Sequence, residues 1–190
     1  MELLKNMILE KGKVFPGNIL KVDSFLNHQV DPNLIDKIGE EFARIFANEN
    51  ITKVLTIESS GITMALAAAK ALKVNMIFAK KTQTKNIAAQ VYSSKVISYT
   101  HGKVYDIIVS TEYLGKDDRV LVIDDFLANG KALEGLIDII NQAGATLVGC
   151  GIAIEKAFQP GGDNLRARGI RVESLAKIGS MTDDTLSFVE

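Results

Sequence analysis

The segment Val120–Ala132, which reads VLVIDDFLANGKA, constrains the fold of this chain more than any other. Its first four residues are apolar and suit a buried central strand, and Asp124 and Asp125 follow directly. A loop of small residues, Ala128–Ala132, then opens a stretch with helical periodicity. In open α/β sheets ligands bind beyond the carboxyl ends of the strands, so this segment predicts an α/β fold and the position of its binding site.

The two carboxylates and the loop also indicate the kind of ligand. Adjacent acids at a strand end repel each other unless they meet ligand hydroxyls or a cation. The N–H groups of the loop and the positive end of the following helix can bind a phosphate, and Gly130 gives the backbone the freedom for this turn. The segment is not a Walker loop, because Ala132 replaces the required Ser or Thr and Asp125 stands where the first glycine belongs. An acidic strand end with an ordinary strand-to-helix loop remains the alternative.

Apolar runs that alternate with helical stretches predict the fold class. Asp31 and Pro32 read as a helix N-cap and first helical residue, and apolar residues recur at helical spacing through Phe46. Strands alternating with helices predict an α/β domain with a mostly parallel sheet flanked by helices. The predicted strands are Lys53–Ile57, Asn75–Ala79, Arg119–Ile123, Thr146–Ile154 and Arg171–Ala176, and the later helices are Ile62–Leu72 and Lys131–Gln142.

A long hairpin interrupts this alternation over about residues 80–112. Apolar and aromatic residues of the segment 91–99 face those of 104–109 across a turn at His101. The arm that leads into the hairpin, Lys80–Asn86, is polar and basic, as a mobile cover of an active site would be. We therefore expect a flexible hairpin beside the site.

Length and composition limit the classes of protein to which this chain can belong. The 190 residues suit one domain, 1–190. Lys and Arg total 22 against 23 Asp and Glu, so the net charge of −1 gives no case for nucleic acid or an anionic membrane. The single Cys150 excludes an internal disulfide, which fits a reducing compartment. Charged residues interrupt the apolar ones of Met1–Lys13, so no signal-peptide core is present there and we expect a cytoplasmic protein.

The 120–132 segment resembles the signature of the type I phosphoribosyltransferases, which bind phosphoribosyl diphosphate (PRPP). The resemblance implies that Asp124 and Asp125 are the catalytic pair beside the ribose and that the following loop cradles the 5′-phosphate. Asn129, Lys131 and Ala132 depart from the hydroxyl residues and second glycine that are frequent in this loop. The backbone N–H groups of the loop can still bind a phosphate, because they do not depend on these side chains. The implied PRPP-binding residues are Ala128, Asn129, Gly130, Lys131 and Ala132.

A second loop supports this resemblance. The predicted strand Lys53–Ile57 runs into Glu58-Ser59-Ser60-Gly61 and then a helix. In the type I family this position is the diphosphate loop, and the resemblance implies that Ser59, Ser60 and Gly61 bind the leaving group with help from Lys80 or Lys81. Taken alone, Ser-Ser-Gly before a helix is as well explained by a helix cap.

The choice of base depends on the N-terminal segment. Phe15–Pro32 resembles the hood that covers the base in the bacterial xanthine phosphoribosyltransferases, and the resemblance extends over essentially the whole chain. It implies that Leu20 and Asn27 lie against the purine and that Lys156 donates to its 6-oxo group. A lysine there disfavours adenine, which presents an amino donor, and favours xanthine, guanine or hypoxanthine. The 2-oxo group of xanthine can accept from the Asn27 amide, whereas a flipped amide would accept from guanine instead.

The activity that the resemblance implies is that of a glycosyltransferase (pentosyltransferase) in purine salvage. It would convert xanthine and PRPP to xanthosine 5′-monophosphate and diphosphate through an oxocarbenium-like sugar, without a covalent intermediate. Mg²⁺ is expected to arrive with PRPP, and no residue is predicted as a direct metal ligand. A hood formed by residues 1–30 with C-terminal residues and a homodimer are expected. The alternatives are a guanine or hypoxanthine phosphoribosyltransferase and a non-catalytic PRPP-sensing regulator, although no DNA-binding motif is recognised.

Other features receive structural interpretations. Cys150 is expected in the core, and Phe158 either in the core or stacked on the base. Gln159–Gly162 predicts a turn after the fifth strand, and the apolar stripe of Leu3, Leu4, Met7 and Ile8 predicts helix packing.

Overall fold

The computed structural model describes residues 1–82, 90–98 and 103–189. Helices and strands alternate along most of these residues. The helices are α1 (Glu2–Lys11), α2 (Pro32–Ile45), α3 (Ile62–Leu72), α4 (Lys131–Gln142) and α5 (Gly161–Ala167), with a π-helical turn η1 (Asp23–Asn27). The strands are β1 (Lys13–Phe15), β2 (Ile19–Lys21), β3 (Lys53–Ile57), β4 (Asn75–Thr82), β5 (Val91–Ser98), β6 (Lys103–Ser110), β7 (Arg119–Leu127), β8 (Thr146–Lys156), β9 (Val172–Met181) and β10 (Leu186–Val189).

The described residues build a main sheet of eight strands in the order β10-β9-β8-β7-β3-β4-β6-β5. The five central strands from β9 to β4 run parallel to one another, which confirms the predicted mostly parallel sheet. β10 at one edge and the β5–β6 hairpin at the other are antiparallel to their neighbours. β1 and β2 form a separate small sheet.

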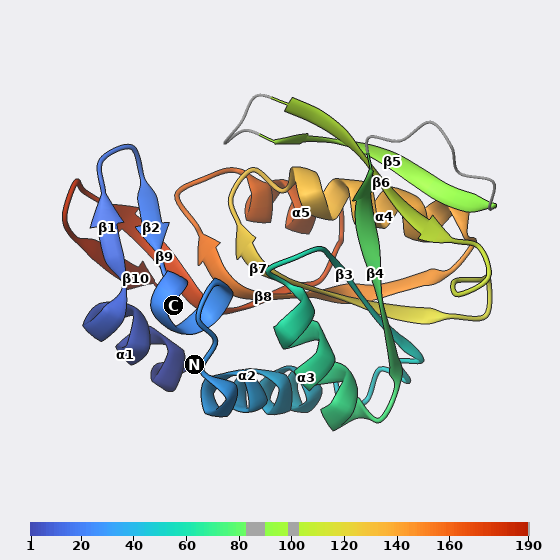
Figure 1. Ribbon diagram of the computed structural model, residues 1–190, viewed down its shortest axis with the longest axis horizontal. Coiled ribbons are helices and arrows are strands. Elements are labelled where there is room, and N and C mark those ends of the chain that lie inside the picture. Colours follow the sequence, from blue (N-terminus) through green and yellow to red (C-terminus); the bar gives the residue numbers. More distant parts are fainter. Residues whose placement is uncertain (83–89, 99–102, 190) are drawn as a thin grey trace.

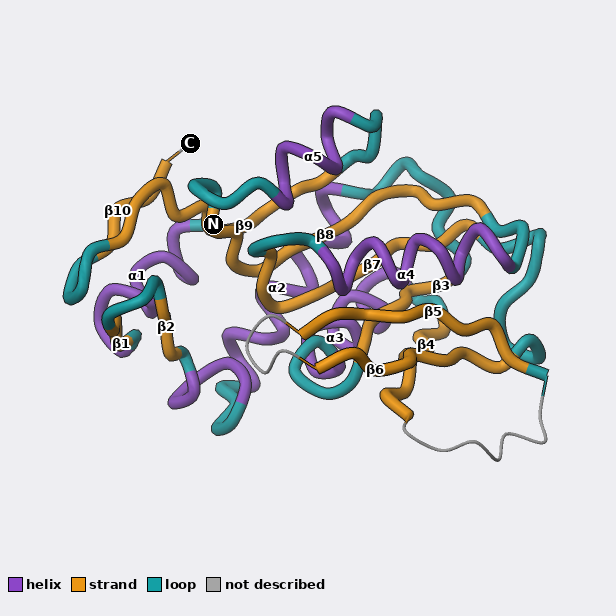
Figure 2. The backbone as a smooth tube through the Cα atoms, turned by 90° about the horizontal axis from the view of Figure 1, so that it is seen from above, coloured by secondary structure: helices purple, strands orange, loops and turns teal. Residues whose placement is uncertain are grey.

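Helices cover both faces of the main sheet. In Figure 1, α2 and α3 lie below the sheet and α4 and α5 above it, and Figure 2 shows α4 and α5 from the upper side. Phe42 and Met64 belong to the core below the sheet, whereas Leu133 and Leu136 belong to the core above it. The four apolar residues of β7, 120–123, are fully buried because both faces of this strand are covered.

The sequence predicts most of the central elements correctly. β3, α3 and α4 have the predicted bounds. Asp31 is the N-cap of α2, and its Oδ1 accepts hydrogen bonds from the N–H groups of Asn33 and Leu34 at 3.0 and 3.2 Å. Cys150 is buried in β8, as expected. The first domain helix and the sheet centre therefore follow from local sequence patterns.

Four predicted strands end too early, because β4 continues to Thr82, β7 to Leu127, β8 to Lys156 and β9 to Met181. β7 continues to Leu127, so Asp124 lies within the strand and not after it, because the strand stays paired with β8 through Asp124↔Ile152. Gln159–Gly162 is not only a turn, since Gly161 is the first residue of α5. Phe158 is 37% exposed and therefore does not lie in the core.

The N-terminal and C-terminal elements gather at one end of the molecule. α1, the β1–β2 hairpin and β10 lie together at the left of Figure 1. Leu4 and Ile8 of α1 are buried, whereas Leu3 is 46% exposed, so the predicted packing stripe is narrower than the sequence suggests. The Met1 amino group donates a hydrogen bond to the Leu175 carbonyl oxygen of β9.

The β5–β6 hairpin extends the sheet beyond β4. Its register runs from Val91↔Ser110 to Ser98↔Lys103, which confirms the predicted hairpin but places Lys103 in β6 and not in the turn. Val96 and Ile107 pack against Gly135 of α4. Most of the basic arm, 83–86, and the turn at His101 lie outside the described residues, so the flexibility of the hairpin stays a prediction. Within residues 1–82, 90–98 and 103–189, none of the helices combines the length and apolar character needed to cross a membrane.

Candidate active site

Two loops meet at the carboxyl edge of the sheet, as the sequence predicts. β3 and β7 are parallel neighbours, paired through Val54↔Leu121, so the loops that follow them lie side by side. A β-carbon added to Gly61 of the first loop would lie 3.1 Å from Asp124 Oδ1. Ser59 is exposed, and a cis peptide bond joins it to the preceding residue. The structure therefore brings the Ser59-Ser60-Gly61 loop against the acid pair.

The two aspartates differ in their environments. Asp124 is only 5% exposed, whereas Asp125 is partly exposed and donates its backbone N–H to Asp124 Oδ1 at 3.0 Å. Burial, followed by the charge of Asp125, raises the pKa of Asp124 well above its ordinary value. Burial also raises the pKa of Cys150 to about 12, with a smaller contribution from Asp124. The charge of Lys81 offsets the raised pKa of Asp124 only in part, so hydroxyl donors or a positive centre in a bound ligand would further stabilise the charged form of Asp124.

The loop after β7 has the backbone geometry of an anion-binding turn. Ala128 and Asn129 form a bend, and Gly130 is the N-cap of α4 with a positive φ of 78°, so the glycine provides the conformation for which it was singled out. The first intrahelical bond of α4 runs from Glu134 N–H to Gly130 C=O at 2.9 Å. Lys131 and Ala132 thus belong to the first turn of the helix, where N–H groups have no carbonyl of their own helix to bind.

The side chain of Lys131 is engaged with its own helix. Its Nζ lies 2.7 Å from Glu134 Oε2, three residues along α4. The backbone of the loop therefore supplies its clearest donors to a phosphate.

Lys81 lies near the end of β4 and contacts Glu58, the residue that precedes the Ser59–Gly61 loop. Its backbone N–H donates to Glu58 Oε1 at 2.5 Å, and its Nζ lies 5.3 Å from the centre of the Tyr105 ring. The charge of Lys81 lowers the pKa of Asp124, although this effect is smaller than those of burial and Asp125. Lys80 is the neighbouring exposed residue. Lys81 is thus placed where it can meet an anion held by the Ser59–Gly61 loop.

Asn27 of the hood contacts the acid pair, although the two lie far apart in the sequence. Asn27 Nδ2 donates to Asp125 Oδ2 at 3.4 Å, and Asn27 Oδ1 is buried without a hydrogen-bond partner among the described residues. Lys156 Nζ donates to the Asn18 carbonyl at 2.8 Å and lies 5.7 Å from the centre of the Phe126 ring. Burial lowers the pKa of Lys156. The side chain of Leu20 is 7% exposed within the hood.

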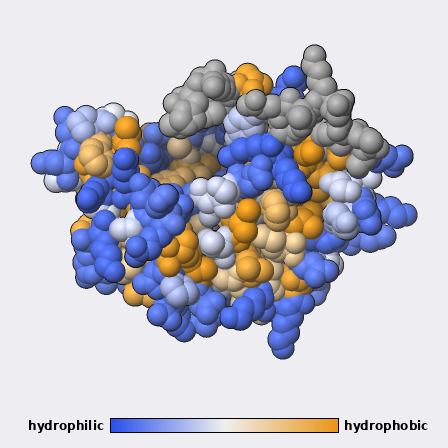
Figure 3. All heavy atoms as spheres, viewed as in Figure 1, coloured by the Kyte–Doolittle hydropathy of each residue, from blue (hydrophilic) through white to orange (hydrophobic). Residues whose placement is uncertain are grey.

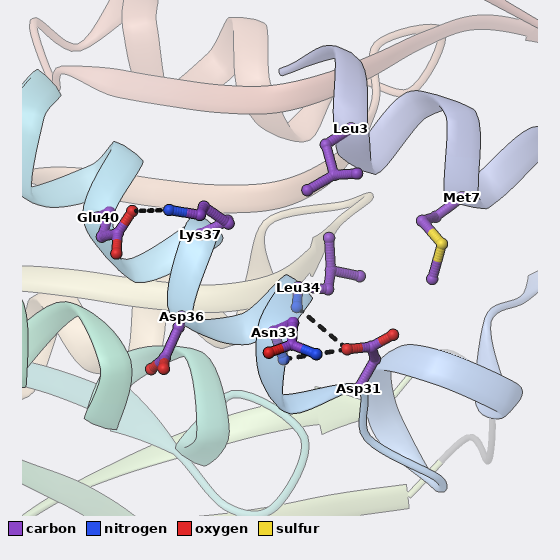
Figure 4. Close-up of a pocket in the computed structure, with 8 residues that line it drawn as sticks. All are labelled: Leu3, Met7, Asp31, Asn33, Leu34, Asp36, Lys37 and Glu40. Atoms are coloured by element: carbon purple, nitrogen blue, oxygen red, sulfur yellow. Dashed lines mark hydrogen bonds and ion pairs between the residues drawn. The ribbon is translucent and has the colours of Figure 1, made fainter.

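A separate cavity of about 420 Å³ lies between α1 and α2 (Figure 4). Figure 4 shows Leu3 and Met7 on one side and Asp31 and Leu34 on the other, with Lys37 paired to Glu40. It contains none of the predicted substrate residues. Its lining residues are Leu3, Met7, Asp31, Asn33, Leu34, Asp36, Lys37 and Glu40.

Three neighbours of the site escaped the sequence analysis. Glu58 anchors the end of β4 through Lys81, and Phe126 packs beside Lys156. Tyr105 has its pKa raised by burial and then by the charge of Asp124, so it lies in the electric field of the acid pair. Glu58 and Phe126 adjoin predicted site residues in the sequence, which is a signal that could have found them. Tyr105 has no such signal, because only the fold brings this residue of β6 within the electrostatic influence of Asp124.

Comparison with known proteins gives the family of this chain. A model of the phosphoribosyl transferase domain matches residues 26–165. The chain belongs to the phosphoribosyltransferase family. It is 56% identical over 189 residues to a xanthine phosphoribosyltransferase of Moorella thermoacetica, with 100% of this chain and 96% of the relative covered. A xanthine phosphoribosyltransferase of Ruminiclostridium cellulolyticum is 55% identical over 190 residues, and both chains are covered completely.

Solved structures support the fold of this phosphoribosyltransferase. An adenine phosphoribosyltransferase of Rhodothermus marinus has a TM-score of 0.75 at 24% identity, covering 93% of this chain and 99% of that one. An adenine phosphoribosyltransferase of Giardia lamblia complexed with 9-deazaadenine has a TM-score of 0.76 at 19% identity, covering 92% and 97%. The predicted α/β architecture with a mostly parallel sheet is therefore that of type I phosphoribosyltransferases.

The raised pKa of Asp124 leads to a stability prediction. Folding raises this pKa, so the unfolded chain loses the proton first and stability falls as pH rises above about 4. Asp124→Asn removes the charge and keeps Oδ1 as acceptor, so it should stabilise the ligand-free enzyme by on the order of 1 kcal/mol, or about 3 °C in Tm. Melting curves from pH 4 to pH 8 measure this, with exposed Asp117→Asn as control. Equal Tm values for wild type and Asp124→Asn at every pH would contradict the assigned cost of this carboxylate.

Proposed function

We propose that this phosphoribosyltransferase transfers the phosphoribosyl group of PRPP to xanthine, giving xanthosine 5′-monophosphate and diphosphate. The observation that carries the proposal is the contact between hood and acid pair, in which Asn27 Nδ2 lies 3.4 Å from Asp125 Oδ2. This contact puts a candidate base-binding side chain directly beside candidate ribose-binding carboxylates. The xanthine phosphoribosyltransferases that are 56% and 55% identical over essentially the full chain support the choice of base.

The PRPP half of the proposed site consists of two anion loops and the acids between them. The backbone of residues 128–132 would bind the 5′-phosphate, and the Ser59–Gly61 loop with Lys81 would bind the diphosphate. Asp124 and Asp125 would accept hydrogen bonds from the ribose hydroxyls. As the bond to diphosphate lengthens, the sugar becomes positive, and the carboxylates stabilise this charge in the same buried surroundings that raise the pKa of Asp124 in the ligand-free protein.

The base half depends on the hood. Lys156 would donate to the 6-oxo group, and Leu20 would pack against the purine. Asn27 holds Asp125 with its amide nitrogen and leaves its buried Oδ1 without a partner. When ribose hydroxyls occupy Asp125, the Asn27 amide is released and can turn to donate to the 2-oxo group of xanthine. The purine nitrogen then attacks the sugar, and no protein nucleophile is required.

Mg²⁺ enters this proposal as part of the substrate, bound to PRPP. It would neutralise the diphosphate as it leaves, and we propose no direct protein ligand for it. We further propose that the enzyme acts in the cytoplasm, where PRPP and free bases are available to a salvage enzyme. Closure of the arm around residues 83–86 over the site belongs to the proposal, since these residues lie outside the described ones.

A product assay tests the function directly. The full chain is incubated with PRPP, Mg²⁺ and xanthine, guanine, hypoxanthine or adenine, and the nucleotide formed is identified by mass spectrometry. Xanthosine 5′-monophosphate is expected to form fastest. Faster formation of guanosine or inosine 5′-monophosphate would favour the oxopurine alternative, and PRPP binding without any product would favour a regulator.

We also propose that two copies of the chain form a homodimer. Leu66 of α3 is 59% exposed and Phe78 of β4 is 37% exposed, and Figure 3 shows hydrophobic side chains gathered where these two elements lie in Figure 1. Light scattering after size-exclusion chromatography should give the mass of two chains for the wild type and of one chain for Leu66→Glu. Leu9→Glu on α1, where Leu9 is 62% exposed, is the matched control. A wild-type monomer would contradict the proposal.

A further inference from the structure

The turn after β8 lies directly against the proposed phosphate loop. Gly161 donates its backbone N–H to the carbonyl oxygen of Ala128 at 3.0 Å. A β-carbon on Gly161 would overlap that oxygen and lie 2.7 Å from the Gly130 nitrogen. Conversely, a β-carbon on Gly130 would lie 3.3 Å from the Gly161 Cα. The two backbones therefore touch, and the start of α5 forms the back wall of the loop.

An ion pair between a buried carboxylate and a partly exposed arginine holds α5 in this position. Glu155 of β8 is 2% exposed, and its two oxygens accept hydrogen bonds from the two terminal nitrogens of Arg166 at 2.7 Å each. Ser174 Oγ donates to the same carboxylate, and Arg166 also donates to the Val172 carbonyl at 3.3 Å. Burial alone would raise the pKa of Glu155, but the hydrogen bonds from Arg166 and Ser174 outweigh it and the pKa is lowered. A β-carbon on Gly162 would overlap Glu155 Oε1, so the helix rests directly on the carboxylate.

The position of Glu155 in β8 places this pair beside the phosphate loop. Glu155 lies opposite Leu127, the last residue of β7 before the phosphate loop. It also directly precedes Lys156, the proposed base-binding lysine. An apolar pair could hold α5 on the sheet as firmly as an ion pair, because buried ion pairs often add little net stability. A bidentate arginine–carboxylate pair adds geometric definition instead, since both nitrogens must meet both oxygens.

We propose that the Glu155–Arg166 pair is a positioning device for PRPP binding. It holds α5 so that Gly161 supports the backbone of residues 128–130 in the shape that receives the 5′-phosphate. Glu155 and Arg166 are positioning residues, because neither is placed in contact with substrate. This inference rests on the proposed function, and it gives a role to Glu155, Arg166 and Gly161, of which the sequence interpretation placed only Gly161 in a turn.

The first test keeps the charge of residue 166 but removes its two-pronged geometry. Arg166→Lys should raise both the KM and the directly measured Kd for Mg²⁺–PRPP by about tenfold, as expected when an indirect support of a binding group is lost. The KM for xanthine should change by less than about twofold, because Lys156 and the hood are unaltered. Arg44→Lys is the matched control, because Arg44 forms a similar two-pronged pair with Glu41 on α2 and its side chain is 71% exposed.

The second test approaches the same contact from the loop side. Gly161→Ala leaves the ion pair intact and crowds the Ala128 carbonyl, so the same selective loss of PRPP affinity is expected. Gly115→Ala is its control, because a β-carbon there meets no atom within 4 Å. PRPP binding within about twofold of wild type in both Arg166→Lys and Gly161→Ala would overturn the proposal, and so would parallel increases in the KM of both substrates.

Calorimetric titration of PRPP in the absence of base separates this inference from the proposed function. A wild-type chain that binds PRPP and forms a nucleotide other than xanthosine 5′-monophosphate would refute the choice of base. The selective weakening of PRPP binding in the two variants would still support the positioning role. A wild-type chain that does not bind PRPP would overturn both proposals.

Discussion

Replacing Asp124 and Asp125 together by asparagine is expected to lower kcat for phosphoribosyl transfer by about 10³-fold, the loss typical of removing a preorganised electrostatic stabiliser. The substitution keeps the size of both side chains, so the strand and its pairing through Asp124↔Ile152 should persist. It removes the negative charge that faces the developing positive sugar, and it replaces two acceptor oxygens with amide donors. Steady-state rates with saturating Mg²⁺–PRPP and xanthine measure the effect.

Controls for this double variant separate chemistry from folding. Asp117→Asn changes an exposed acid before β7 and should retain wild-type rates. The melting temperature of the double variant should not fall, because it removes both the burial of a charge at position 124 and the repulsion from Asp125, the two causes that raise the pKa of Asp124. Transfer at a rate near that of wild type would exclude both aspartates from the catalytic machinery.

Loss of the Asp124 charge is expected to raise the stability of the ligand-free protein and to lower kcat. Both effects follow from one feature of the fold. The carboxylate is 5% exposed beside a second acid, which makes its charged form costly in the ligand-free protein. The same surroundings strengthen its interaction with a positive sugar, because charges act over a lower dielectric inside the protein. A residue that weakens the free protein while serving the reaction is typical of a functional site.

The sequence predicts the centre of this fold well because local patterns decide it. The apolar run Lys53–Ile57 and the helical periods of Ile62–Leu72 and Lys131–Gln142 coincide with β3, α3 and α4. Their burial on both sides of a parallel sheet leaves little freedom in the choice of residues.

The ends of the elements depend on partners that local patterns do not reveal. β8 extends to Lys156 because it pairs with both neighbours, including Glu155↔Lys177 on β9. α5 begins with Gly161-Gly162, residues that disfavour a helix, and is held by an ion pair between Arg166 and Glu155. Such long-range contacts override local propensity.

The site also combines features that the sequence predicts with contacts that only the fold reveals. Parallel neighbours place the Ser59–Gly61 loop beside Asp124, and this follows from strand order alone once the sheet is inferred. The contact of Asn27 with Asp125 joins residues 98 positions apart, and no spacing rule predicts it. The support of Gly130 by Gly161 is likewise visible only in three dimensions.

Lys156→Met is expected to lower kcat/KM for xanthine by about 100-fold, because a hydrogen bond from a charged donor contributes about 1.5–3 kcal/mol. Methionine keeps an unbranched apolar stem beside Phe126 but cannot donate to the 6-oxo group. The KM for PRPP should change by less than about twofold, since the phosphate loops are untouched. Rates with xanthine, guanine, hypoxanthine and adenine measure the loss for each base.

The pattern across bases distinguishes recognition from a general loss of structure. All three oxopurines present an acceptor at position 6, so their rates should fall together, whereas any weak rate with adenine should stay the same or rise. Lys37→Met, at a side chain of α2 that is 59% exposed, should leave every rate unchanged. Lys156 Nζ already donates to the Asn18 carbonyl in the ligand-free protein, and an ammonium group has two further protons for the base. A xanthine rate within about threefold of wild type in Lys156→Met would therefore mean that this lysine only anchors the hood.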